Sequence, residues 1–369
     1  MPIRMEDDPQ DQQDFDESKS SGGGGGGMGG GGLMNFLPMI LGLFGGGGGG
    51  KKIILLLVLA VGGYFLFTKS GCNSSSVTDI VKKFSSSGYS FSPEQFKKAS
   101  VYEALDSTRD PLPESVSLLK YAPHRGDQGQ QGSCVAWSSV YGARTIVEAA
   151  STGGDPNAIA FSPAFVYNNI ALENCQGSYI QKAMEFMTDK GVLPMADFPY
   201  DQNDCERQAS SSLMNKAAGY KMHGFKRLTE SDDVNGINIR AIKEHLANNA
   251  PVVIGMMVGG SFMRDMMGKE QWTPSQEDRS QMGFGGHAMC VVGYDDRRVA
   301  KYPDGSTYIG CFQVMNSWTE DWGVKGVAWI GYGDFKEFVR EAYGIDPMPK
   351  RGAALNAPFE CAIGLVKND

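Results

Sequence analysis

The sequence contains no pair of cysteines separated by two residues, which argues against a closed zinc site and against a thioredoxin-type redox motif. Its seven cysteines stand apart from one another, at Cys72, Cys134, Cys175, Cys205, Cys290, Cys311 and Cys361. An odd number leaves at least one thiol unpaired. An unpaired thiol is compatible with a reactive group and equally with a small buried side chain.

Positive charge is also scarce. The chain has 34 Lys and Arg against 42 Asp and Glu, a formal net charge of -8, and no stripe of basic residues. Proteins that bind nucleic acid generally need a basic surface that contacts the phosphates. We therefore expect no nucleic-acid partner.

Residues 1–50 have few side chains that can build a core. They are acidic and then rich in glycine, with runs such as SGGGGGGMGGGG. This composition cannot bury enough apolar surface to offset the entropy cost of ordering, so we predict a disordered tail. The apolar stretch LMNFLPMILGLF within the tail contains a proline and is too short to span a membrane, which favours an interfacial position.

Residues 53–67, IILLLVLAVGGYFLF, form an uncharged apolar run flanked by lysines. The run is shorter than the ~20 residues of a typical span, but flanking lysines can extend their charged ends to the interface. A cleaved signal peptide would begin near the N-terminus, so we predict one uncleaved transmembrane segment over residues 51–69. A buried core helix is the alternative. The flanking lysines do not decide the orientation, and our hypothesis places the following domain outside the cytoplasm.

The stretch DQGQQGSCVAWS, residues 127–138, ends in a cysteine followed by a helical pattern. Apolar residues spaced four and three apart predict one buried helix face that ends at Gly153 and Gly154, with Ser133 as the N-terminal cap. These residues are Ala136, Val140, Ala143, Val147 and Ala150. A thiol on the first helical residue lies near unpaired backbone N–H groups, which lower its pKa. Cys134 is therefore a candidate nucleophile.

A nucleophilic thiol needs a base, and the chain has only four histidines. His287, in FGGHAMCVVGYDD, lies at the mouth of a buried strand predicted over residues 288–292. The other three histidines lie in polar contexts without an assigned role, and His245 is predicted to be solvated. Asn316, in VMNSWTEDWGVKG, follows a second predicted strand over residues 310–315. The intervening turn YPDGS predicts an antiparallel hairpin that brings Asn316 beside His287.

These residues resemble the catalytic set of the papain-like cysteine peptidases, which have Gln, Cys, His and Asn in this order. The resemblance runs from Leu112 to Gly333 and includes the blocks FSPAFVYN, NCQGSY, GVLPMADFPY and NNAPVVIG. It is closer to bacterial members than to lysosomal ones. The resemblance implies an α+β fold in two lobes, one helical and one formed by a β-sheet, with the site between them.

Carried over to this chain, the resemblance assigns a role to each of these residues. Cys134 would attack the scissile carbonyl, His287 would transfer the proton, and Asn316 would orient His287. Gln128 and the Cys134 backbone N–H would stabilise the oxyanion, and Trp318 would shield the Asn–His hydrogen bond from water. The implied reaction is hydrolysis of peptide bonds through a thioester, without a metal or cofactor.

The same resemblance implies how a peptide or protein substrate would bind. Gly177 and Ser178 would pair with its backbone in a strand-like manner, and Gly286 would offer its carbonyl. The residues that align with the walls of the pocket for the second side chain before the cut are Ile180, Gly255, Gly285 and Ala288. An apolar side chain is expected in that pocket. For the glycines, turn geometry alone is the alternative.

The chain also departs from the family pattern. Gln131 stands where the family has a structural cysteine, so the usual bridge to the loop that contains Cys175 is impossible. Cys175 then pairs with Cys205 or remains free. The region before the domain is too short, and lacks the helical pattern, to be the usual inhibitory propeptide.

We therefore divide the chain after the membrane segment into three parts. Residues 70–110 are a linker or short pro-segment, with a helix predicted over residues 92–105 that Ser92 can cap. Residues 111–345 form the peptidase domain, and residues 346–369 a C-terminal extension.

Two other functions fit the same residues. An acyl-transfer ligase or transpeptidase would pass the thioester to an amine instead of water. A non-catalytic, membrane-tethered module would only bind peptides, although binding alone would not require a thiol, an imidazole and an amide together. The sequence does not indicate the oligomeric state.

Overall fold

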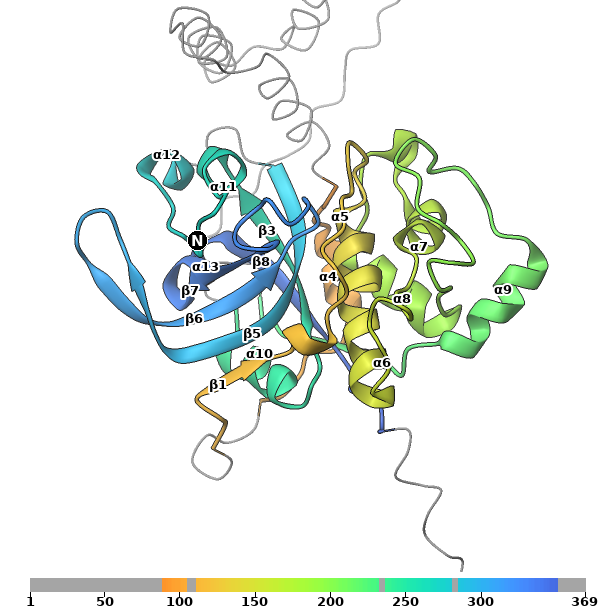
Figure 1. Cartoon of the computed structure of the whole chain (residues 1–369), viewed down its shortest axis with the longest axis horizontal. Coiled ribbons are helices and arrows are strands. Elements are labelled where there is room, and N and C mark those ends of the chain that lie inside the picture. The colour runs from red at the N-terminus through yellow and green to blue at the C-terminus, as the bar shows by residue number, and fades with distance from the viewer. Residues whose placement is uncertain (1–87, 105–110, 232–235, 281–284, 351–369) are drawn as a thin grey trace, which may run out of the picture. The chain divides into compact units, whose positions relative to one another are not determined.

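The computed structural model of the chain describes residues 88–104, 111–231, 236–280 and 285–350. Within these residues, the helices between residues 134 and 217 lie together on one side, and the strands form a sheet on the other (Figure 1). This is the predicted α+β arrangement with a helical lobe and a sheet lobe. The predicted tail over residues 1–50 and the predicted membrane segment over residues 51–69 lie outside the described residues.

One long helix begins at the candidate nucleophile. It runs without a break through α5 (Cys134–Ala136), the π-helical segment η3 (Trp137–Arg144) and α6 (Thr145–Thr152). It ends where Gly153 adopts a left-handed conformation with φ of 70°, a conformation that suits glycine. The predicted helix is thus confirmed, and four of its five periodic apolar residues are buried.

The prediction that the Ser133 side chain caps this helix was wrong, although Ser133 occupies the predicted position. Ser133 is the N-cap residue, but its side chain makes no cap hydrogen bond. Its hydroxyl lies 2.7 Å from the hydroxyl of Tyr200 instead. The serine therefore connects the start of the helix to a neighbouring loop.

The other helices of the helical lobe surround this long helix. Figure 1 shows α7 and α8 beside it and α9 at the outer edge. The bounds are α7 (Pro163–Ile170), η4 (Glu173–Cys175), α8 (Ile180–Asp189), α9 (Ser211–Ala217) and η5 (Ala218–Tyr220). The described cysteines include one disulfide, which joins Cys175 to Cys205. This is the pairing that the sequence left open.

The sheet has the strand order β2-β8-β3-β5-β6-β7-β4, with β1 paired to β5. The strands are β1 (Ser115–Ser117), β2 (Phe225–Arg227), β3 (Val252–Val258), β4 (Gln271–Trp272), β5 (Gly285–Lys301), β6 (Thr307–Met315), β7 (Val327–Gly331) and β8 (Val339–Ile345). The antiparallel pair β5–β6 contains the predicted hairpin, with Cys290 opposite Met315. Shorter helices accompany the sheet, namely η2 (Leu119–Tyr121), α10 (Ile239–Ala247), α11 (Gly260–Arg264), α12 (Gln276–Arg279) and α13 (Tyr332–Phe338).

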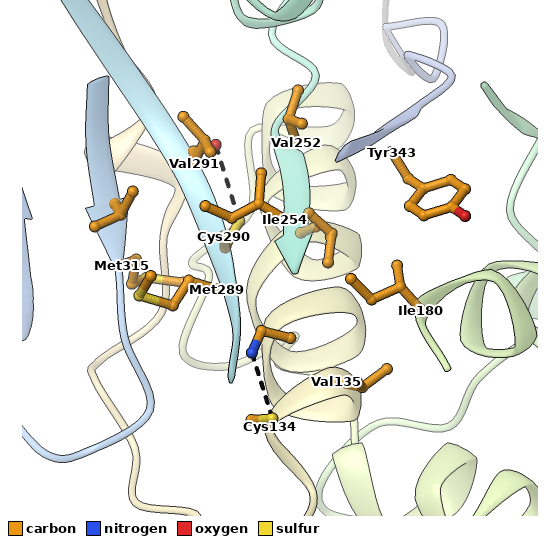
Figure 2. Packing of buried hydrophobic residues seen from close by; sticks show 14 of the residues in the cluster. Cys134, Val135, Ile180, Val252, Ile254, Met289, Cys290, Val291, Met315 and Tyr343 are labelled. Atoms are coloured by element: carbon orange, nitrogen blue, oxygen red, sulfur yellow. Dashed lines mark hydrogen bonds between the residues drawn. The ribbon is translucent and has the colours of Figure 1, made fainter. Parts of the chain in front are cut away.

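The long helix packs directly on β5, which creates the core between the two lobes. Figure 2 shows Val135 and Ile180 from the helical lobe together with Ile254 and Met289 from the sheet. All four side chains are essentially inaccessible to solvent, and burial of each contributes about 1.5–3 kcal/mol. At Gly142 a Cβ would approach the Met315 side chain to 3.0 Å, so a small residue is needed where helix and sheet are closest.

Residues 88–104 also pack against this domain. Ser92 caps α4 (Pro93–Lys98), as predicted, by accepting a hydrogen bond from the Gln95 backbone N–H. The helix ends earlier than predicted because the chain becomes extended and pairs with Arg227 of β2. The Arg227 N–H donates to the Ser100 carbonyl, and the Tyr102 N–H donates to the Arg227 carbonyl, each at 2.9 Å.

None of the helices in the described parts of the chain is long and apolar enough to cross a membrane.

The disulfide yields a prediction about stability. Replacing both Cys175 and Cys205 by Ser removes a link between positions separated by 30 residues. We expect a loss of about 3–4 kcal/mol in the free energy of unfolding, because an unlinked unfolded chain has more conformational entropy. Urea unfolding followed by tryptophan fluorescence measures this loss. Reductant should destabilise the wild-type protein to a similar extent and leave the double variant unchanged; equal stability of all samples would contradict the prediction.

Candidate active site

Cys134 lies at the junction between the long helix and the sheet. Its side chain is fully buried. The backbone N–H of Ala288, on β5, points at the Cys134 sulfur with a nitrogen to sulfur distance of 3.4 Å (dashed line at Cys134 in Figure 2). The helix start therefore brings the thiol against the strand that contains His287.

His287 and Asn316 form a hydrogen bond between β5 and the end of β6. The His287 Nε2 lies 2.8 Å from the Asn316 Oδ1, and the Ser317 backbone N–H donates to the same oxygen at 2.8 Å. An amide oxygen can only accept, so the Nε2 of His287 carries the proton. The Nδ1 of a neutral His287 then has a free lone pair that can accept a proton.

Trp318 covers this pair. Its ring stacks on the His287 ring, with centroids 4.3 Å apart and an angle of 26° between the planes. Phe262 and Trp322 pack around Trp318 with ring centroids at 5.9 and 6.3 Å. This aromatic layer excludes water from the Asn–His hydrogen bond and so strengthens it.

Gln128 is held by the residue that follows Asn316. Its Oε1 accepts a hydrogen bond from the Ser317 hydroxyl at 2.8 Å, and its backbone N–H donates to the Ser317 carbonyl at 3.0 Å. The Gln128 Nε2 donates to the Gln131 carbonyl at 3.0 Å. The amide group is therefore oriented, and one of its two N–H donors is engaged by the protein's own backbone.

A segment of the chain itself lies across Cys134. The Ser178 N–H donates to the Gly88 carbonyl at 2.9 Å, and the Ser90 N–H donates to the Ser178 carbonyl at 3.1 Å. The Tyr89 N–H donates to the Gly286 carbonyl at 3.4 Å. Residues 88–90 thus pair with Ser178 and Gly286, two of the residues predicted to hold substrate backbone.

Glycine is required where this segment comes closest. A Cβ on Gly286 would collide with the Tyr89 carbonyl, and a Cβ on Gly255 would collide with the Tyr89 ring. Gly255 lies inside β3 and not in a turn, so close approach explains this glycine. A Cβ on Gly177 would likewise collide with the Gly88 carbonyl. The Gly177 N–H is directed at the Tyr167 hydroxyl, so Ser178 makes both strand-like hydrogen bonds.

The other predicted pocket residues lie around the same point. Ala288 is the cross-strand partner of Gly255, and Ile180 is fully buried at the start of α8, two residues after Ser178. The prediction for His245 was wrong, because this side chain is buried on α10 and not solvated. Its ring packs on Tyr102 with centroids 4.6 Å apart, and burial lowers its pKa.

The expected lowering of the thiol pKa does not hold in this form of the protein. Burial raises the pKa of Cys134 to about 11, although the backbone N–H groups of Ala288 and Gly88 act in the opposite direction. Loss of water from a charged group outweighs the favourable dipoles at the helix start. Cys134 is therefore a neutral thiol at pH 7 while residues 88–90 cover it.

Several residues of the site could not be recognised in the sequence. Ser317 lies inside the NSW block but has no periodic or spacing signal of its own. Gly88 and Tyr89 belong to a polar segment without a motif. Glu341, which lies opposite Gly255 on β8, could be found only from the pairing of strands distant in sequence. The described residues contain no group of three or more His, Cys, Asp or Glu that could hold a metal ion.

The chain resembles known proteins in sequence and in fold. A family model described as "Papain family cysteine protease" matches residues 113–346. An uncharacterized peptidase C1-like protein of Acanthamoeba polyphaga mimivirus is 28% identical over 226 residues, which are 58% of this chain and 64% of that protein. Cathepsin K of Mus musculus is 28% identical over 225 residues, 59% of each chain. The crystal structure of xylellain, a cysteine protease from Xylella fastidiosa, matches with a TM-score of 0.56 and 21% identity, covering 72% of this chain and 97% of that one.

The sequence matches cover only part of the related proteins, and the structural match is at low sequence identity. The chain spans less than two thirds of the length of the mimivirus and mouse proteins. The likeness to xylellain, at 21% identity, concerns the fold.

The raised thiol pKa yields a prediction about reactivity. With a pKa of about 11, the thiolate is only about one part in ten thousand at pH 7, and it rises about tenfold with each pH unit. Alkylation of Cys134 by iodoacetamide should therefore be slow at pH 7 and should accelerate up to about pH 11. Tyr89→Ala should speed labelling at pH 7, because it loosens the segment that keeps water away from the thiol. Peptide mass mapping locates the adduct. A rate that is already at its plateau at pH 7 in the wild-type protein would contradict this.

Proposed function

Because the chain belongs to the papain family of cysteine proteases, we propose that it is a cysteine-type peptidase that hydrolyses peptide bonds in extended polypeptides. One observation carries the proposal. Backbone groups of Ser178 and Gly286 beside Cys134 already hold a stretch of polypeptide, residues 88–90, by hydrogen bonds. A substrate would use the same backbone groups, which recognise an extended chain without regard to most of its side chains.

The chemistry follows from the protonation state of His287. Its Nδ1 takes the proton from the Cys134 thiol, and the sulfur then forms a bond to the scissile carbonyl carbon. When the carbon–nitrogen bond breaks, His287 gives the proton to the leaving amine, and a thioester remains. Water then attacks the thioester, loses a proton to His287 and releases the acid, and the proton returns to the sulfur. Asn316 holds the imidazole in the required tautomer throughout.

Gln128 supplies one donor to the oxyanion and the Cys134 backbone N–H supplies the other. The Gln128 Nε2 has two N–H donors, so one keeps its hydrogen bond to the Gln131 carbonyl and the other can bind the substrate oxygen. Ser317 keeps the amide oriented through its hydrogen bond to the Gln128 Oε1. Donors fixed in this way stabilise charge in the transition state without reorganisation.

The form in which residues 88–90 cover Cys134 is inactive in this proposal. The Gly88 carbonyl is directed to the Ser178 N–H, while the Gly88 N–H is near enough to the thiol to lower its pKa. The thiol therefore faces an N–H group and not a carbonyl carbon, so the segment blocks the site without being cleaved. Activity requires that residues 88–90 move away from Cys134.

We also propose that residues 51–69 anchor the protein in a membrane as a single span, with the peptidase domain outside the cytoplasm. The apolar run with flanking lysines supports the anchor, and the Cys175–Cys205 disulfide favours an oxidising compartment. The disulfide stands in place of the bridge that Gln131 excludes, which supports the bacterial type within the family. If residues 53–67 anchor the protein, carbonate extraction of membranes should release a variant that lacks them and should leave the full chain in the membrane. Equal release of both proteins would contradict the anchor.

The first experiment tests the reaction and its residues. The full chain with Tyr89→Ala is incubated with an unfolded protein substrate, and the products are analysed by mass. Cys134→Ala should abolish cleavage. Gln128→Ala should lower kcat by about 10²–10³, the usual loss for one oxyanion donor. Gln130→Ala, at an exposed neighbouring position, is the matched control and should leave kcat unchanged.

Two results would contradict the assignment. Cleavage that survives Cys134→Ala would show that the thiol is not the nucleophile. Equal rates for the Gln128 and Gln130 variants would remove Gln128 from the reaction. Products extended by an added amine, in place of hydrolysed ones, would identify a ligase or transpeptidase.

A further inference from the structure

The loop that pairs with polypeptide backbone beside the nucleophile is anchored by one buried side chain. Residues 172–178 lie between α7 and α8 and end in Ser178, whose N–H and carbonyl both form hydrogen bonds to residues 88–90. The loop also packs against the residues just before the nucleophile, because a Cβ on Gly132 would lie 3.0 Å from the Gly177 nitrogen. A shift of the loop therefore moves Ser178 relative to the reacting thiol.

The backbone of this loop is held in a conformation that few residues adopt on their own. Asn174 and Cys175 have φ of 56° and 58°, in the left-handed region. Residues other than glycine occupy this region at a cost in free energy and stay there only when surrounding contacts fix them. Two contacts are the Cys175–Cys205 disulfide and the hydrogen bond from the Leu172 N–H to the Gly177 carbonyl at 2.9 Å. The disulfide holds the middle of the loop, and the hydrogen bond joins its ends.

The Tyr167 hydroxyl binds two further backbone groups of the loop. It donates to the Cys175 carbonyl at 2.7 Å and accepts from the Gly177 N–H at 3.3 Å. Tyr167 is fully buried on α7, so the packing of its ring fixes the position of the hydroxyl. Burial also raises the pKa of Tyr167. The hydroxyl therefore keeps its proton near neutral pH and can make both hydrogen bonds at once.

We propose that Tyr167 is a positioning residue for substrate binding, because its hydroxyl fixes the backbone that presents Ser178 to a substrate. This inference rests on the proposed peptidase function. The disulfide acts only through the side chain of Cys175, whereas the hydroxyl of Tyr167 holds the peptide groups on both sides of Gln176. The Gln176 side chain is exposed. Tyr167 thus sets the orientation of the two peptide groups that precede Gly177 and Ser178.

Loss of this hydroxyl should affect binding and not chemistry. Ser178 would hold the substrate backbone equally in the ground state and in the transition state, and such an interaction changes KM and leaves kcat unchanged. In the full chain carrying Tyr89→Ala, we expect Tyr167→Phe to raise KM for a fluorogenic peptide about tenfold, as for the loss of one to two hydrogen bonds. Tyr141→Phe is the matched control and should leave KM unchanged. It also removes a hydroxyl that donates to a backbone carbonyl, that of His124 at 2.8 Å, but on the long helix.

A second measurement uses the chain's own segment and needs no catalysis. In the full chain with Cys134→Ala, residues 88–90 remain paired with the loop, and hydrogen–deuterium exchange followed by NMR reports on the N–H groups of Ser178 and Ser90. Tyr167→Phe should speed the exchange of these two amides about tenfold, again as for one to two hydrogen bonds, and leave the amides of α6 unchanged. A residue with a merely structural role would instead speed exchange throughout the core, through global unfolding.

The two measurements separate failure of the positioning role from failure of the peptidase function. Unchanged exchange at Ser178 and Ser90 in the Tyr167→Phe protein overturns the proposal, and so does faster exchange throughout the core. A fall in kcat without a rise in KM overturns it as well. If exchange changes only in the loop and in its partner segment while the Tyr89→Ala protein cleaves no peptide, the peptidase function fails and the positioning role stands.

Discussion

The site depends on the close packing of one helix end against one strand. The helix that begins at Cys134 approaches β5 so closely that the Ala288 N–H meets the thiol and that Gly142 has little room for a side chain. Because His287 precedes Ala288 on that strand, the same contact brings base and nucleophile into one region. The Asn–His hydrogen bond, the Trp318 stack and the Ser317 bridge to Gln128 all build on this contact.

Two opposing effects act on the pKa of the Cys134 thiol, and their balance decides whether the thiol is neutral or ionised. Unpaired N–H groups at the start of a helix favour a thiolate by a fraction of a kcal/mol to about 2 kcal/mol. Full burial disfavours it by more, and the pKa of Cys134 rises to about 11. Under the proposed function, the Cys134 thiol is inert while residues 88–90 cover it and becomes reactive once water and substrate replace them.

Much of the site could be predicted because its signals are local in sequence. Helical periodicity after Cys134 and turn residues between β5 and β6 define their elements without any distant contact. Of the two readings of Gly255, pocket wall or turn, its place inside β3 rules out the turn, and the missing side chain allows the Tyr89 ring to come close. The hydroxyl partner of Ser133, the covering of Cys134 and the place of Glu341 could not be predicted. Each depends on segments that are far apart in sequence and meet only through strand register or loop packing.

The Cys175–Cys205 disulfide forms only where thiols are readily oxidised. A catalytic thiolate exposed in such surroundings is also the group most easily lost to sulfenic and higher oxidation states. In this chain the thiol next to the disulfide-bearing loop is buried and protonated, and both properties slow that chemistry. While residues 88–90 cover Cys134, the nucleophile is therefore less open to oxidation than an exposed thiolate would be, under the same conditions that allow the Cys175–Cys205 disulfide to form.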